Sequence, residues 1–241
     1  MCASCRTVQS HARLACVVLF DIDGTLLTGP TTGPSAGVEA MAACARTVTG
    51  QDGLHRRVEF AGRTDRQIAR DMLVASGAAS PSPHQLDAFV GRYVEALRSR
   101  IGQRPYRPLN GVREAVRVLH DRGAIVGLGT GNVRLGAQAK LESAGLADLF
   151  DLDRGGYGDD ADTRDEVLRV GVSRCDPTGS LPVIIVGDTP YDVRAALDIG
   201  ALCVAVPTGM YDAPSLIEAG AHRLVAGLDA TLADELRDLL P

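Results

Sequence analysis

The sequence predicts an α/β protein: a doubly wound, Rossmann-like parallel sheet core with an inserted helical cap domain. Two observations predict this fold. Short apolar runs that read as buried strands alternate with segments of helical periodicity, which is the order of a parallel sheet covered by helices on both faces. In addition, the first two of these strands are separated by about 100 residues, far more than one crossover connection needs.

Four apolar runs are predicted to be the buried strands of the sheet. They are Leu14 to Phe20, Ala124 to Leu128, Pro182 to Val186 and Ala201 to Val206, and each ends in glycine, polar or charged residues. Continuous apolar runs of this length are typical of strands covered on both faces. Cys16 and Cys203 lie in two of them, where cysteine usually packs as a small hydrophobic residue.

Helical patterns separate the later strands. They cover residues 111–123, 132–145 and 192–200, and a last helix over 230–240 is expected to pack against the sheet. Together with the strands, these helices assign residues 1–30 and 106–241 to the core domain.

The long interval after the first strand is predicted to be a helical cap domain, residues 31–105. It contains three segments with helical periodicity and little strand character, at 37–48, 63–77 and 83–101. Segments rich in glycine and proline at 29–35 and 102–111 are predicted to be its two hinges.

Composition excludes several classes of function. The formal net charge of −5 gives no general attraction for nucleic acid or an anionic membrane, and no apolar run approaches the roughly 20 residues that span a bilayer. Arg13 before an apolar run resembles a signal peptide, but the run is short and carboxylates follow it, so we expect a cytoplasmic protein. Cys2 and Cys5 form an isolated CxxC, which is a weak metal or redox signal.

Polar side chains follow three of the predicted strands, where a doubly wound sheet binds its ligands. These residues are Asp21 and Asp23 after the first strand, Thr130, Gly131 and Asn132 after the second, and Asp188 and Asp192 after the third. Four carboxylates at one edge would repel each other strongly, and burying them unpaired costs several kcal/mol. A hard divalent cation resolves that conflict, and Mg²⁺ suits a few carboxylates plus a substrate phosphate.

Each motif alone has an ordinary structural explanation. The two aspartates after the first strand fit a capped turn, "GLGTGN" lacks the third glycine of a dinucleotide fingerprint and the lysine of a P-loop, and Asp192 fits a helix cap. Gly24 and Thr25 are expected to serve the turn through their backbone. The occurrence of all three motifs in order, at three predicted strand ends, favours a functional site.

The combination of "DIDGTLL", "GLGTGN" and "GDTPYDV" resembles the haloacid dehalogenase superfamily of phosphotransferases, in the branch with a helical cap inserted after the first motif. The resemblance covers essentially the whole chain. It implies that Asp21 is a nucleophile that forms an aspartyl-phosphate, that Asp23 is the general acid and then the general base, and that Thr130 binds the phosphoryl group with nearby backbone amides, for which Gly131 and Asn132 are candidates. It further implies that Asp21, Asp188 and the backbone carbonyl of Asp23 hold Mg²⁺, with Asp192 supporting the metal site.

The third motif of that superfamily, a basic residue that is usually lysine, has two candidates here. Arg164 stands at the corresponding place, after "GLADLFD" and somewhat over 20 residues before the last motif. Lys140, on the predicted helix after Thr130, is the only lysine in the chain. Arginine would clamp a phosphate bidentately, whereas lysine would act as a point charge or lie at the surface. Both residues stay candidates.

The resemblance implies a Mg²⁺-dependent phosphatase of a small phosphorylated metabolite, similar to phosphoglycolate phosphatases. We expect a monomer or a homodimer, between which the sequence does not decide. Arg63, Thr64 and Asp65 in the cap are candidate substrate contacts, although a helix cap with solvated charges explains them equally well. A sugar-phosphate phosphomutase similar to β-phosphoglucomutase is the nearest alternative, and a phosphoacceptor signalling protein is a second. A dehalogenase is disfavoured, because Asp23 has no role in displacing halide.

Overall fold

The computed structural model describes residues 13–240 and contains the predicted doubly wound sheet. Its six strands are all parallel and lie in the order β5-β4-β1-β6-β7-β8. Their bounds are β1 Val17–Phe20, β4 Ile125–Gly129, β5 Gly155–Gly156, β6 Val183–Gly187, β7 Leu202–Ala205 and β8 Arg223–Leu224. The first strand along the chain is therefore central, and β4 and β6 flank it.

The two faces of the sheet carry separate apolar clusters because successive residues of a strand point to opposite sides. In β1, Val18 and Phe20 belong to one cluster, and Val17 and Leu19 belong to the other. Three helices that follow residue 105 pack into the first cluster, which also includes helical residues between 36 and 101: α4 (Val112–Asp121), α5 (Arg134–Ser143) and α9 (Leu232–Leu239). Three others pack into the second: α6 (Arg164–Cys175), α7 (Pro190–Asp198) and α8 (Ala213–Glu218).

The predicted elements of the core are present with shifted ends, and some elements are additional. The first strand begins at Val17 rather than Leu14, although Leu14 is still buried. The sequence reasoning missed β5 and β8, because two residues are too few to show a periodicity. It also missed α6 and α8, whose apolar positions are sparse, and the single-turn helices η1 (Leu54–Arg56) and η2 (Ala147–Leu149).

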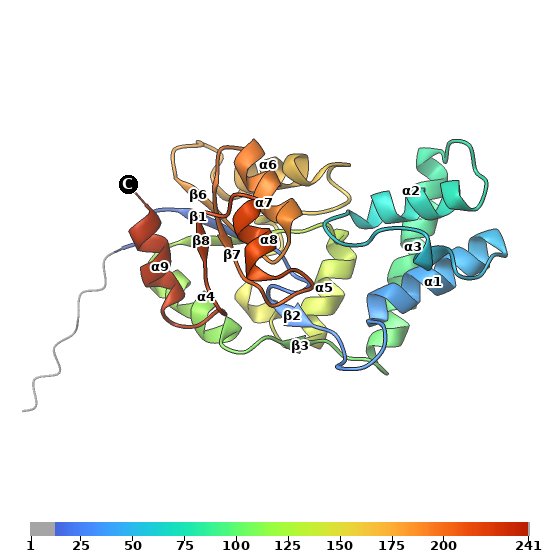
Figure 1. The fold of residues 1–241 in the computed structure, drawn as a ribbon, viewed down its shortest axis with the longest axis horizontal. Coiled ribbons are helices and arrows are strands. Elements are labelled where there is room, and N and C mark those ends of the chain that lie inside the picture. The colour runs from blue at the N-terminus through green and yellow to red at the C-terminus, as the bar shows by residue number, and fades with distance from the viewer. Residues whose placement is uncertain (1–12, 241) are drawn as a thin grey trace, which may run out of the picture.

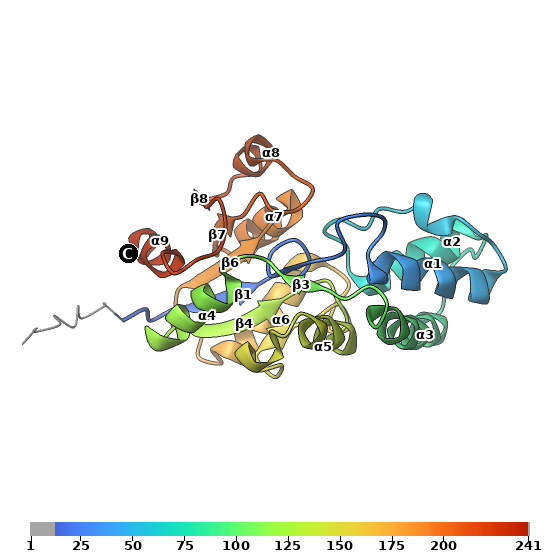
Figure 2. The same ribbon diagram turned by 90° about the horizontal axis from the view of Figure 1, so that it is seen from below.

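The insertion between the first two sheet strands of the chain is helical, as predicted. It consists of α1 (Ala36–Thr49), α2 (Asp65–Ala75) and α3 (Pro83–Ile101), which begin at the capping residues Ser35, Thr64 and Ser82. Figures 1 and 2 show these three helices grouped together, apart from the sheet and its covering helices. A short antiparallel ribbon of β2 (Leu27–Thr28) and β3 (Arg107–Pro108) joins the two parts. We call residues 31–105 the helical insertion; these domain limits stay a prediction.

The cysteines inside the described range are structural. Cys16, Cys44, Cys175 and Cys203 are buried and free, which confirms the prediction for Cys16 and Cys203. The isolated CxxC of Cys2 and Cys5 lies outside the described residues. Among the helices at residues 13–240, none has the length and apolar character that a membrane crossing requires.

Candidate active site

The ends of three adjacent strands bring the predicted site residues together. Asp21 follows β1, Thr130 follows β4 and Asp188 follows β6. Because β1 pairs with both other strands in parallel, all three side chains emerge at the same edge of the sheet. The Asp21 backbone amide donates to the Val186 carbonyl, which extends the pairing up to the aspartate itself. The site therefore lies at the ends of the central strands of the sheet.

Three buried carboxylates form a compact group at this edge. Asp21, Asp188 and Asp192 each offer one oxygen, and these oxygens lie within 4.8 Å of one another. The Thr25 hydroxyl donates to Oδ1 of Asp188 at 3.0 Å, and the Thr189 hydroxyl donates to Oδ2 of Asp192 at 2.7 Å. Thr25 thus acts through its side chain, which corrects the expectation that it serves only the turn. Asp192, which was predicted to support the metal site from close by, offers one of these three oxygens.

Gly24 is required for this arrangement. Its φ of +85° lies in the left-handed region, and a Cβ at this position would stand 2.3 Å from Oδ2 of Asp188. The chain therefore turns next to Asp188 at a glycine, the residue type that leaves room for the Asp188 carboxylate.

Burial makes the negative charge of this group unfavourable. Desolvation raises the pKa of Asp188 to about 8, with further contributions from the charges of Asp192 and Asp21. Desolvation also raises the pKa of Asp21, to about 6, although Arg164 opposes it. Three close carboxylates, with the ionised forms of Asp21 and Asp188 destabilised by burial, are a donor set that a hard divalent cation stabilises, so the residues present fit Mg²⁺.

Arg164 neutralises part of this charge. One of its terminal nitrogens lies 2.7 Å from Oδ1 of Asp21 and also donates to Oδ1 of Asp192. Burial disfavours its cationic form, but Asp192 and Asp21 outweigh burial and raise its pKa, so the guanidinium stays charged. Its Nε is buried and has no hydrogen-bond partner among the described residues. Arg164 thus contacts the predicted nucleophile directly and keeps one donor uncommitted.

Lys140 contacts the other predicted catalytic aspartate. Its Nζ lies 2.6 Å from Oδ2 of Asp23 and 2.6 Å from Oδ1 of Asn132. The Asn132 amide in turn donates to Oδ2 of Asp23 and to the Thr130 hydroxyl, both at 2.8 Å. Lys140 is buried, and the Tyr106 ring lies 5.4 Å from its Nζ. The two cations therefore serve different aspartates, a division that sequence spacing alone could not reveal.

The three candidate residues of the helical insertion have different environments. Arg63 lines the cavity described below and forms an ion pair with Asp71 at 3.4 Å. Thr64 is fully buried and does not line that cavity; its hydroxyl caps α2 by accepting from the Gln67 amide. Asp65 accepts from the Val133 amide at 2.9 Å, at the start of α5, and its own amide donates to the Gly131 carbonyl. Asp65 therefore joins the insertion to the core.

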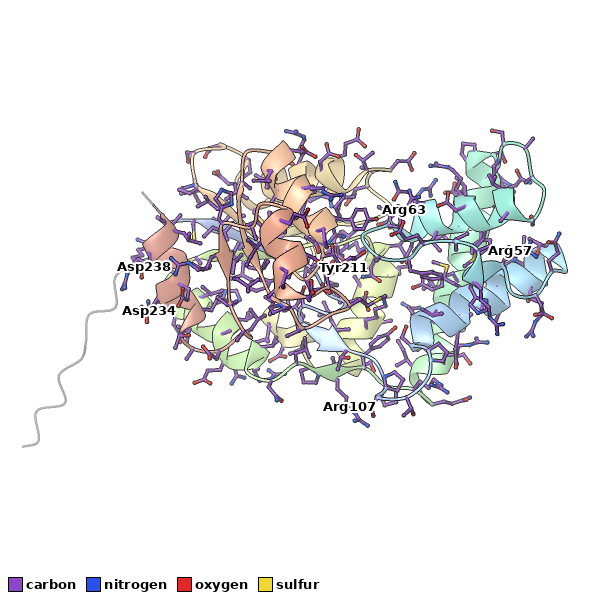
Figure 3. The ribbon with its side chains drawn as sticks, in the orientation of Figure 1. Arg57, Arg63, Arg107, Tyr211, Asp234 and Asp238 are labelled. Atoms are coloured by element: carbon purple, nitrogen blue, oxygen red, sulfur yellow. The ribbon has the colours of Figure 1, made fainter. Side chains whose placement is uncertain are left out.

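A cavity of about 430 Å³ lies between the strand ends and the helical insertion. Its lining includes all the predicted site residues except Thr64. Figure 3 shows Arg63 on the side of the insertion that faces the core, and Tyr211 on the core below it. The cavity is large enough for a phosphoryl group and an attached organic group of moderate size.

Comparison with known proteins agrees with the geometry. A family model of haloacid dehalogenase-like hydrolases matches residues 17–200, and a second model of that type matches residues 169–236. The chain is 28% identical to the phosphoglycolate phosphatase of Synechococcus elongatus over 204 residues, 84% of this chain and 88% of that protein.

Two solved structures share the fold. A hydrolase from Pseudomonas syringae matches with a TM-score of 0.67 at 19% identity, covering 94% of this chain and all of the other. CbbY from Rhodobacter sphaeroides, solved in complex with phosphate, matches with a TM-score of 0.67 at 16% identity, covering 89% and 95%. With a family model spanning most of its length and the motif residues gathered at one sheet edge, the chain belongs to the haloacid dehalogenase-like hydrolases.

Proposed function

We propose that the protein is a Mg²⁺-dependent phosphatase that hydrolyses a small phosphomonoester through an aspartyl-phosphate at Asp21. The observation that carries this proposal is the group of Asp21, Asp188 and Asp192 with Arg164 set against it, at the floor of a cavity of about 430 Å³. The similarity to a phosphoglycolate phosphatase supports the reaction class. Phosphoryl transfer needs a placed nucleophile and charge neutralisation more than elaborate covalent machinery, and this site supplies both.

In the first step, a carboxylate oxygen of Asp21 attacks phosphorus and the bond to the leaving oxygen breaks. With a pKa of about 6, Asp21 is ionised at neutral pH, as a nucleophile must be. Asp23 gives its proton to the leaving alkoxide. In the second step, Asp23 takes a proton from water, the water oxygen attacks phosphorus, and the bond to Asp21 breaks to release phosphate.

We assign Arg164 to the phosphoryl group and Lys140 to Asp23. Arg164 lies against Asp21, which places its guanidinium beside the proposed point of attack on the phosphoryl group. Lys140 and Asn132 both bind Oδ2 of Asp23, which fixes that carboxyl group and leaves Oδ1 for proton transfer. Arg164 thus takes the third-motif role, and Lys140 is a positioning residue for the acid and base.

The carboxylates of Asp21 and Asp188 and the backbone carbonyl of Asp23 would hold Mg²⁺, with Asp192 beside them. When bound, the ion neutralises charge on the carboxylates and on the phosphoryl oxygens. Thr130, whose hydroxyl is fixed by Asn132, would contact the phosphoryl group together with the amides of Gly131 and Asn132.

We further propose that the helical insertion acts as a cap that excludes water from the reaction. Asp65 ties the insertion to the amide of Val133 and the carbonyl of Gly131, both next to the phosphoryl site. A Cβ on Gly131 would stand 2.3 Å from the Arg63 carbonyl, so insertion and core are in close contact here. Exclusion of water strengthens the electrostatic interactions inside the site.

The decisive experiment replaces the nucleophile. We expect Asp21→Asn to abolish Mg²⁺-dependent hydrolysis of p-nitrophenyl phosphate, while circular dichroism shows an intact fold, because asparagine has the same shape. Turnover retained by this variant would refute the assignment. Assay of a sugar phosphate with and without its bisphosphate separates hydrolysis from phosphomutase activity, since only a mutase depends on the bisphosphate.

A further inference from the structure

The helical insertion gives the cavity a mainly apolar wall. Its contribution to the lining includes residues of α1, of α2 and of the loop before α2, which are Val38, Met41, Phe60, Ala61 and Ile68. Met41 and Ile68 are buried, and Val38 and Phe60 are half-buried with their remaining surface available to a ligand. A wall of this kind favours apolar groups, by about 25 cal/mol for each Å² removed from water.

The cations that line the cavity are already paired. Arg164 binds Asp21 and Asp192, and Lys140 binds Asp23 and Asn132. Arg63 pairs with Asp71, and 38% of its side chain is exposed. Within residues 13–240, these three are the lysine and arginine residues on the lining. A second anionic group on the substrate, placed against the apolar residues of this wall, would have no cation beside it other than Arg63, which is already paired with Asp71, so its burial there is unfavourable.

One buried polar group on the insertion does remain available. The Tyr93 side chain lines the cavity from α3, the residue is 1% exposed, and its hydroxyl has no hydrogen-bond partner among the residues described. Burial raises its pKa well above the usual value, so the hydroxyl stays neutral. A hydroxyl in this setting offers one hydrogen bond to a ligand, because an unmade bond is costly there.

Resting on the proposed function, we propose that the leaving alcohol of the substrate is uncharged and mainly apolar, with a single hydrogen-bonding group directed at Tyr93. This substrate class excludes carboxylate-bearing esters such as phosphoglycolate, the substrate named for the relative described above.

The first test compares benzyl phosphate with 4-carboxybenzyl phosphate at saturating Mg²⁺. The methylene group insulates the leaving oxygen, so the two esters differ mainly in the distant charge. We expect wild-type kcat/KM to be about 100-fold higher for benzyl phosphate, equivalent to about 2.7 kcal/mol. A ratio below 10, or faster turnover of glycerol 3-phosphate than of benzyl phosphate, overturns the inference. The proposed function survives those outcomes, because it is tested separately by whether any phosphomonoester is hydrolysed and by the Asp21→Asn variant.

Matched variants test whether the wall itself selects. Val38→Arg and Phe60→Arg place a cation on the wall at half-buried positions, and each should lower the ratio at least 10-fold by raising kcat/KM for the carboxylate ester. Val48→Arg adds the same charge on α1 at an exposed residue outside the cavity, and should leave the ratio unchanged. If Val48→Arg lowers the ratio as much as the other two, long-range charge rather than the wall is responsible, and the inference is wrong.

Tyr93→Phe tests the single polar contact. We compare benzyl phosphate with its ortho, meta and para hydroxymethyl derivatives. At least one derivative should be turned over more than 3-fold faster than benzyl phosphate by the wild type, and Tyr93→Phe should remove that advantage while benzyl phosphate turnover changes little. A wild type that shows no advantage, or a variant that keeps it, overturns the role of Tyr93.

Discussion

Replacing each of the two buried cations by methionine should produce different kinetic defects. Arg164 contacts Asp21, the proposed nucleophile, whereas Lys140 contacts Asp23, which we propose protonates the leaving alkoxide. An alkyl leaving group needs that proton, but p-nitrophenolate leaves readily without it. Lys140→Met should therefore discriminate between the two kinds of ester, and Arg164→Met should not.

The exposure of the paired carboxylates determines the expected loss of activity and of stability in each variant. Arg164→Met leaves Asp21 and Asp192 without a cation, although their side chains are only 11% and 1% exposed. Loss of one such donor costs about 10²- to 10³-fold in kcat. Breaking a buried pair costs about 3–5 kcal/mol of stability, most of which bound Mg²⁺ should restore. The Asp23 side chain is 43% exposed, so Lys140→Met should destabilise less.

The assay is kcat/KM, which reports steps up to formation of the aspartyl-phosphate. For Lys140→Met we expect a loss of about 10²-fold with an alkyl phosphate, within the range of general acid catalysis, and less than about 5-fold with p-nitrophenyl phosphate. For Arg164→Met we expect similar losses with both esters. Equal losses for the two esters in Lys140→Met would refute its assignment to Asp23. A leaving-group dependence confined to Arg164→Met would reverse the two roles.

Two further predictions concern the metal site and the contact between insertion and core. At 100 times its Kd, Mg²⁺ should stabilise the wild type by about 2.7 kcal/mol and raise Tm by roughly 5–10 °C, and Gly24→Ala should abolish that shift because its Cβ displaces Asp188. Gly50→Ala is the control, because Gly50 has a similar φ of +71° but a Cβ added there would have no atom within 4 Å. Loss of the Mg²⁺-induced rise in Tm in both variants would contradict the explanation that the Cβ at position 24 displaces Asp188. Desolvation raises the pKa of Asp65 from 3.8 to about 6, so the folded state binds the Asp65 proton more tightly than the unfolded state does. Protonation of Asp65 therefore stabilises the folded state below about pH 4, and this contribution to the free energy of unfolding is lost as the pH rises through 6. In urea denaturation, wild type should lose up to about 3 kcal/mol relative to Asp65→Asn between pH 4 and pH 7, and parallel pH profiles would contradict this.

The sequence predicted the core of the fold because its signals are local. Each central strand is an apolar run bounded by turn residues, and the predicted ends of β4, β6 and β7 differ from the observed ones by one residue. The edge strands β5 and β8 are held by pairing to a neighbour rather than by their own composition. Gly155 and Gly156 in β5 have no β propensity at all, so only the finished sheet reveals them.

The site residues that lie at the ends of strands could be predicted from the sequence. Asp21, Asp23, Thr130 and Asp188 follow central strands directly, so parallel pairing alone brings them together. Lys140 and Arg164 lie on helices, where the direction of a long side chain depends on how the helix docks. For Thr25, the sequence signal was its place in "DGT", two residues after Asp23, which could have indicated that its side chain belongs to the site. Tyr93 lies 72 residues after Asp21 in the chain, and its place in the cavity depends entirely on how the insertion folds over the core.

Charge balance connects the metal, the two cations and the selectivity of the cavity. Four carboxylates from the strand ends meet two cations, Lys140 and Arg164, so the group carries two excess negative charges when all are ionised. We propose that one divalent cation offsets this excess before the phosphoryl dianion binds. A second anion on the substrate would find no such compensation, because each cation is already engaged and the insertion offers an apolar wall. The charge balance from which we propose a divalent ion therefore also supports our proposal that the leaving alcohol is uncharged.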